Sequence, residues 1–449
     1  MSKKLFEDFK GVTSKAWKQK IQVDLKGADY NDTLIWTTNE DINVKPFYHQ
    51  DDLLIDKPLP VASNTWNICQ TIFVADTKLS NKKAVNAIDR GAESIAFILP
   101  DKEVSISELI KNIDIAVIPL HFELQFLDAV FVAELYKLSS NNITVNTDIV
   151  GNLAKSGNWF SGFETDFLAL ETIVTANPSA ISINAGLYQN AGANIVQQLA
   201  YTLAHANEYL NAFGSKIVAP VTFNVTVGTN YFFEIAKLRA LRVLWATIAK
   251  EYNANTDCRI FVTPTKRNKT IYDYNTNMLR TTTECMSAIL GGANTICNLA
   301  YDAIYHKDNE FGERIARNQL LILKHESYFD AVENASDGSY YIENLTTQLS
   351  EKALTLFKSI EDNGGFLHLL NSGTIQKKIK ESAQKEIEQF NNKSLILLGT
   401  NKHPNPDDKM KSNLELYPFL KMNARKTSIE PILEKRIAEA AEQDRLNQE

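Results

Sequence analysis

Short apolar runs rich in β-branched residues alternate with amphipathic stretches between residues 71 and 300. The runs have the length and composition of buried parallel strands, and the stretches between them have the period of helices. Eight such runs occur, at 71–75, 93–99, 115–122, 142–150, 180–186, 217–227, 258–264 and 294–300. Eight strands alternating with helices close a (β/α)8 barrel, which typically takes about 250 residues. The pattern therefore predicts an α/β fold, a barrel of the TIM type over residues 71–310.

The stretches between the runs have one apolar face each. In residues 194–213, Ile195, Leu199 and Leu203 recur at steps of four, and residues 231–252 repeat this spacing. Side chains at this spacing lie on one side of a helix. We expect these faces to cover the outside of the barrel.

Residues 1–70 form a predicted N-terminal arm with scattered large aromatic side chains and no periodic pattern. Such a segment cannot bury its own aromatics, so it packs either on the barrel or on a second chain. Both alternatives stay open, and the partner-interface candidates are Phe6, Trp17 and Trp36.

After the barrel, residues 311–449 have helical periodicity and form a predicted helical extension. Gly364 and Gly365 follow one of its helices as a C-terminal stop. The charged tail from residue 431 is typical of a solvated helix.

Composition and net charge disfavour several classes of function. The net charge of −7 leaves no basic track for nucleic acid, and no window holds 18 uninterrupted apolar residues. The four cysteines show no CxxC spacing, which disfavours a zinc site or a disulfide framework. We therefore expect a cytoplasmic protein without a bound metal, a membrane segment or a nucleic-acid partner.

The carboxyl ends of barrel strands are where chemistry is expected. His121 is the one histidine at these positions, and neither HxH nor HExxH occurs, so hydrolytic metal chemistry is disfavoured. Glu123 and Asp148 could form a carboxylate pair. Together with Lys266 they leave a stand-alone lyase or hydrolase open as an alternative.

Several long segments resemble one enzyme family. The run N-x-x-R-T-T-x-E-x-x-x-A-x-L-G-G at 277–292, followed by FGERIARNQLLILKHES at 311–327 and DGSYYIE at 337–343, is similar to the adenosylcobalamin-dependent acyl-CoA mutases, methylmalonyl-CoA mutase above all. Further similar segments extend the resemblance over most of residues 1–400. It implies a barrel that takes an acyl-CoA along its axis and a separate α/β domain for the cobalamin.

The resemblance also exposes departures from the family pattern. The family places arginine and tyrosine on the first strand, an arginine after the fourth, tyrosine and histidine after the fifth, and a histidine after the eighth. The residues at these positions here are Cys69, Thr71, Ser156 (beside Lys155), Gly186, Leu187 and Cys297. Stabilising a carbonyl oxygen and a carboxylate needs placed hydrogen-bond donors, so this joint loss predicts no catalytic residue in the chain.

The family's cobalamin-binding motif gives a second indication of what this chain does. The family motif D-x-H-x-x-G supplies the cobalt ligand from a domain of over a hundred residues, whereas no D-x-H occurs here and 49 residues follow Thr400. We therefore expect this chain to bind no cofactor and to lack the cobalamin domain.

Together the resemblance and its departures imply a non-catalytic small subunit of a heterodimeric methylmalonyl-CoA mutase, with adenosylcobalamin in the large subunit. Self-association of the isolated chain stays open. The alternative is the acyl-CoA-binding barrel of a split mutase whose cobalamin domain is a separate chain. Candidates for a residual pocket are Gln70, Asn146 and Gln189.

Overall fold

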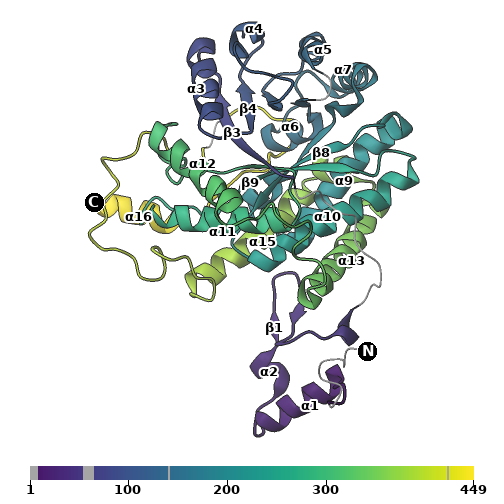
Figure 1. Ribbon diagram of the computed structural model, residues 1–449, viewed down its shortest axis with the longest axis vertical. Helices are drawn as coiled ribbons and strands as arrows, with labels where there is room; N and C mark the ends of the chain where they lie inside the picture. The colour runs from purple at the N-terminus through teal and green to yellow at the C-terminus, as the bar shows by residue number, and fades with distance from the viewer. Residues whose placement is uncertain (1–8, 54–64, 140–141, 422–423) are drawn as a thin grey trace, which may run out of the picture.

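The computed structural model describes residues 9–53, 65–139, 142–421 and 424–449. Eight parallel strands form one sheet in the order β6-β5-β4-β3-β10-β9-β8-β7, which curls into a barrel (Figure 1). The strands are β3 (Asn67–Phe73), β4 (Ser94–Leu99), β5 (Leu120–Leu124), β6 (Ile143–Asn146), β7 (Ser182–Asn184), β8 (Val221–Val227), β9 (Cys258–Pro264) and β10 (Thr295–Cys297). The predicted barrel of the TIM type is confirmed.

Helices follow the strands and cover the barrel. They are α3 (Thr77–Asp89), α4 (Ile106–Leu109), α5 (Ala129–Leu138), α6 (Ile149–Ser156), α7 (Phe163–Ala176), α8 (Gly186–Ala191), α9 (Ile195–Phe213), α10 (Tyr231–Glu251) and α11 (Thr276–Leu290). In Figure 1, α3, α4, α5 and α7 lie above the strands, and α9 and α10 lie below them. The helices predicted at 194–213 and 231–252 are confirmed as α9 and α10.

Several strands are shorter than their apolar runs. Residues 180–186 were one predicted strand, but β7 ends at Asn184 and Gly186 begins helix α8. Residues 115–119 precede β5, whose ladder begins at Leu120. Ala185 and Leu187 are buried although they follow β7, and Val117 before β5 is 69% exposed, so an apolar run does not by itself define the length of a strand.

The hydrogen-bond ladder of the barrel is open between β6 and β7, the two ends of the strand order. Side chains connect the strands there instead. The Thr147 hydroxyl donates to the Ala180 carbonyl at 2.5 Å, and the Asn184 backbone N–H donates to the Asp148 carboxylate at 2.6 Å. The barrel is therefore closed at this seam by side-chain hydrogen bonds.

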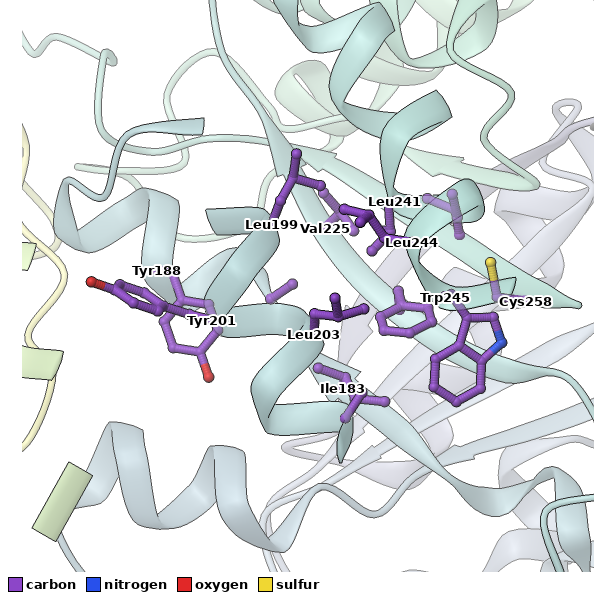
Figure 2. Close-up of a cluster of buried hydrophobic side chains, with 14 of the residues drawn as sticks. Ile183, Tyr188, Leu199, Tyr201, Leu203, Val225, Leu241, Leu244, Trp245 and Cys258 are labelled. Atoms are coloured by element: carbon purple, nitrogen blue, oxygen red, sulfur yellow. The ribbon is translucent and has the colours of Figure 1, made fainter. Parts of the chain in front are cut away.

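The largest core cluster lies between the strands and helices α9 and α10 (Figure 2). Ile183 of β7, Leu203 of α9 and Trp245 of α10 are each buried there. Trp245 satisfies its indole N–H by donating to the Asp257 carbonyl at 3.1 Å. Burial of these side chains fixes both helices against the barrel.

The N-terminal arm contains α1 (Ser14–Asp24), α2 (Tyr30–Leu34) and the pair β1 (Trp36–Thr37) and β2 (Asn43–Val44). It projects away from the barrel, below it in Figure 1, and α1 buries none of its residues. Trp17 stacks on Phe47 at 4.2 Å within the arm, and Trp36 packs edge-on against Phe233 of α10 at 5.8 Å. Trp17 and Trp36 nevertheless remain 44% and 52% exposed. Phe6 lies outside the described residues.

The C-terminal part is largely helical, as predicted. Its helices are α12 (Glu310–His325), α13 (Tyr340–Asp362), α14 (Phe366–Asn371), α15 (Thr374–Asn391) and α16 (Glu439–Gln448). The predicted solvated helix from residue 431 is wrong, because the chain is not helical from 431 to 436 and α16 begins only at Glu439. Ile432 is buried and its N–H donates to the Ala154 carbonyl, so the tail is fixed against α6. None of the described helices is long and apolar enough to cross a membrane.

Candidate functional site

A cavity of about 800 Å³ occupies the inside of the barrel. Side chains of a strand alternate between the two faces, so every second residue of each strand points into this space. Polar side chains dominate the part near the strand ends. They are Glu123 of β5, Asn146 of β6, Asn184 of β7, Asn224 of β8 and Thr263 of β9.

Four of these side chains form a polar ring. Glu123 and Asn146 are paired in register on β5 and β6, and Asn184 and Asn224 are paired on β7 and β8. The three asparagine amides make no hydrogen bond to another side chain or backbone group of the described residues, so their donors and acceptors remain free for a ligand. This polar ring suits a molecule with its own hydrogen-bond donors and acceptors.

His121 lies two residues before Glu123, deeper in the same cavity. Its ring packs edge-on against Phe261 at 5.1 Å, and its Nε2 atom is buried without a hydrogen-bond partner among the described residues. Burial lowers the pKa of His121 to about 4, and the positive charge of Arg259 adds to this effect. The imidazole is therefore neutral near pH 7, which suits hydrogen bonding rather than binding of an anion.

Both signs of charge occur at the mouth of the cavity. Lys155 follows β6 on helix α6, Lys266 follows β9, and Arg425 reaches the mouth from the C-terminal segment. Arg425 donates to the Ser156 carbonyl at 2.5 Å. Asp308 and Glu434 also line the mouth, so its electrostatic character is mixed.

The structure brings three predicted positions together. Cys69 and Thr71 lie on β3, and Cys297 is the in-register neighbour of Cys69 on β10. The Thr71 hydroxyl lies 2.9 Å from the Cys297 sulfur. Thr71 and Cys297 line the cavity, and they therefore hydrogen-bond to each other at the places where the family resemblance implies tyrosine and histidine.

Gly186, Leu187 and Ser156 have different surroundings. Gly186 lines the cavity, and a Cβ atom added there would lie 2.9 Å from the Thr226 methyl group, so the site has no room for a side chain. Leu187 is only 1% exposed and belongs to the hydrophobic core instead of the cavity wall. The Ser156 hydroxyl, at the end of α6, donates to the Asn158 carbonyl at 2.9 Å.

Of the residual-pocket candidates, Asn146 and Gln70 line the cavity and Gln189 does not. Gln70 accepts a hydrogen bond from Arg317 of α12 at 3.3 Å. Gln189 is buried behind the wall, where its side chain accepts from Lys237 at 3.1 Å and donates to Glu234 at 2.8 Å. Gln189 therefore belongs to a buried network around Lys237.

The carboxylate of Asp148 is fully engaged. It accepts from the backbone of Gly151 at 2.8 Å and of Asn184 at 2.6 Å, from the Tyr209 hydroxyl at 2.6 Å, and it pairs with His205 at 2.8 Å. Burial alone would raise the pKa of Asp148, but His205 and these hydrogen bonds hold it below its usual range. Asp148 is thus a fixed structural anion, which removes one member of the alternative site with Glu123 and Lys266.

His205 was missed from the sequence. It lies in helix α9 among apolar residues and has no exposed surface, so its position resembles any core position of an amphipathic helix. A buried histidine needs hydrogen-bond partners. Asp148 was therefore the feature of the sequence that could have pointed to His205.

Comparison with known proteins settles the family. The model of the methylmalonyl-CoA mutase family matches residues 113–448. The chain belongs to this family. A relative from Porphyromonas gingivalis named methylmalonyl-CoA mutase small subunit is 35% identical over 90% of this chain and 71% of its own length.

Two further relatives belong to the same mutase family. The methylmalonyl-CoA mutase of Cereibacter sphaeroides is 28% identical over 86% of this chain and 64% of its own length. The methylmalonyl-CoA mutase large subunit of Porphyromonas gingivalis is 32% identical over 51% of this chain and 34% of its own length. The chain therefore spans only part of the length of these mutases.

The fit of adenosylcobalamin to a mutase chain can be tested on the fold. In the part of the chain that the structure describes, the barrel sheet is accompanied only by the two-stranded pair β1–β2. These residues form no second α/β sheet, so no cobalamin domain is evident among them.

Proposed function

We propose that the chain is the non-catalytic small subunit of a heterodimeric methylmalonyl-CoA mutase. Its large partner would bind adenosylcobalamin and interconvert methylmalonyl-CoA and succinyl-CoA. The similarity to a protein named as a small subunit supports this role, and Porphyromonas gingivalis has proteins named as both subunits.

One observation carries the non-catalytic role. Thr71 and Cys297 hydrogen-bond to each other at 2.9 Å, and Gly186 contributes no side chain to the cavity wall. An acyl-transfer or radical enzyme holds its substrate oxygens with donors fixed in a dry site. Short side chains that engage each other leave no such donor at these three positions.

The chain would act through its contact with the large subunit. Helix α1 buries none of its residues, and Val12, Trp17 and Val23 are exposed on the projecting arm. Exposed aromatic and aliphatic side chains are typical of surfaces that another protein covers. We assign the arm, with the exposed Trp17 of α1 and Trp36 of β1, to the subunit interface.

The test is reconstitution from separately purified subunits. Each chain alone and the mixture are assayed for succinyl-CoA formation from methylmalonyl-CoA with adenosylcobalamin. The proposal predicts no turnover by this chain alone and a tight, active heterodimer on mixing. Turnover by this chain with an isolated cobalamin domain would contradict it.

A second function has one observation in its favour. The 800 Å³ cavity and its free asparagine amides could still take an acyl-CoA, as the barrel of a split mutase would. Calorimetric titration of the isolated chain with methylmalonyl-CoA distinguishes the two. Micromolar affinity would favour the split mutase, and no heat of binding would favour the small subunit.

We propose a cytoplasmic location. All four cysteines are free and buried, which is compatible with a reducing compartment.

A further inference from the structure

The cavity reaches only one of the four cysteines. Cys297 lines its wall, whereas Cys258 and Cys285 are buried outside the lining. A small reagent that enters the barrel therefore meets the Cys297 sulfur first.

A second thiol lies directly beside it. Cys69 and Cys297 are in-register neighbours on the parallel strands β3 and β10, so their side chains point to the same face. Neighbouring strands lie about 4.8 Å apart. This spacing falls within the Cα separation of disulfides, roughly 4.4–6.8 Å. The pair can therefore be bridged without moving the strands apart.

The surroundings favour the thiolate of Cys297 over the other thiols. A hydrogen bond from Cys69 and another from Thr71 lower the pKa of Cys297, although its burial acts in the opposite direction. Burial raises the pKa of Cys69, and raises that of Cys258 to about 11. Since the thiolate is the nucleophile, Cys297 has the best-prepared sulfur of the chain.

We propose that Cys297 and Cys69 form a redox-active thiol pair inside the barrel, with Cys297 as the attacking thiol and Cys69 as the resolving thiol. The oxidant is a low-molecular-weight disulfide. The inference rests on the cavity and the strand register, and it is independent of the proposed subunit role.

The chemistry takes two exchange steps. The Cys297 thiolate attacks one sulfur of the small disulfide, forms a mixed disulfide and expels one thiolate. Cys69 then gives its proton to the thiolate expelled in the first step and attacks the Cys297 sulfur, which expels the second thiolate. The two cysteines lose two electrons in all, and the small disulfide is reduced to two thiols.

The product would join the first and last strands of the barrel along the chain. β3 and β10 are neighbours in the sheet, and the bond would lock their pairing covalently. Residues between them, including both sides of the open β6–β7 seam, would then lie within one covalent loop.

The experiment treats the full-length native chain with bis(2-hydroxyethyl) disulfide, alkylates the remaining thiols and maps the peptides by mass spectrometry. The expected product is a Cys69–Cys297 disulfide, formed about tenfold or more faster than any modification of Cys258 or Cys285. The Cys69→Ser variant should stop at a mixed disulfide on Cys297. The Cys258→Ser variant is the matched control and should behave as the native chain.

Three results would overturn the proposal. They are equal reaction of all four cysteines, reaction only under unfolding conditions, and a mixed disulfide on Cys297 that Cys69 never resolves in the native chain. The native peptide map needs no substitution, so a variant that fails to fold leaves the test intact.

Discussion

The Asp148 carboxylate accepts the backbone N–H of Asn184 at 2.6 Å across the seam between β6 and β7. These strands are the two ends of the hydrogen-bonded order, so no ladder joins them. One carboxylate therefore replaces part of a ladder, caps helix α6 through Gly151, and holds His205 in the core. The residue that the sequence offered as one member of a carboxylate pair with Glu123 instead closes the barrel.

Replacing Asp148 by Ala should destabilise the fold severely. It leaves the Asn184 N–H, the Tyr209 hydroxyl and His205 without their acceptor in a buried site. We expect a loss of about 3–5 kcal/mol in the free energy of unfolding. Urea denaturation measures it. The control is Asp76→Ala, which removes the exposed cap of α3 at Leu79 and should cost only about 1 kcal/mol. Equal losses in the two variants would contradict the role of Asp148.

His121 should make stability depend on pH. Its folded pKa, about 4, lies below the unfolded value of about 6.5. Between these values the unfolded chain binds the proton and the folded chain does not. The stabilisation is therefore complete above about pH 6.5 and falls as the pH drops toward 4, by up to about 3 kcal/mol.

Unfolding free energies measured across this window check the prediction. The His121→Gln variant should have a flatter profile than the native chain. An identical slope in both proteins would show that His121 is not the group responsible.

Substitution of Lys237 tests the buried network of hydrogen bonds behind the cavity wall. Its ammonium group lies 2.5 Å from Glu234, 3.0 Å from the Gln198 side chain and 2.7 Å from the Thr226 carbonyl, and both charged groups are buried. Lys237→Met should cost about 3–5 kcal/mol because it leaves the Glu234 charge unpaired. Adding Glu234→Gln should recover part of that loss. Chemical denaturation of the single and the double variant measures both losses in the free energy of unfolding. A double variant less stable than Lys237→Met alone would contradict the pairing of Lys237 with Glu234.

The arm tests the proposed interface. Trp17→Ala removes the stack on Phe47 and should lower the unfolding free energy of the isolated chain by only about 1 kcal/mol, because α1 buries none of its residues. It should weaken binding to the large subunit about tenfold or more. Calorimetry with the two purified subunits measures this. Leu168→Ala is the matched control and should not change affinity, because Leu168 is 66% exposed on α7, which lies at the opposite end of the molecule from α1 in Figure 1.

The strand count and the barrel could be predicted because each buried strand has its own apolar run, separated by helical periodicity. The seam could not, because Asp148 and Asn184 are 36 residues apart and nothing local pairs them. The tail was misjudged for a related reason. Charged residues there, such as Arg436 and Glu442, are buried because they pair with each other, and composition alone assigns such residues to solvent.

The candidate site was predicted in part. Thr71, Gly186 and Cys297 line the cavity as expected from their strand ends. Leu187 and Gln189 do not, because the run at 180–186 turns into helix α8 before its predicted end. Successive residues of the short helix α8 face different ways, so Gly186 lies at the cavity wall and Leu187 lies in the core.

The most direct test of the non-catalytic role is the kcat/KM of the reconstituted heterodimer when this chain carries Asn146→Leu and Asn224→Leu. These changes turn two free amides of the polar ring into apolar groups of similar size, which would disrupt any acyl-CoA held there. A small-subunit role predicts kcat/KM within about twofold of the native complex. A loss of about tenfold or more, in a heterodimer that assembles normally, would show that this barrel takes part in turnover.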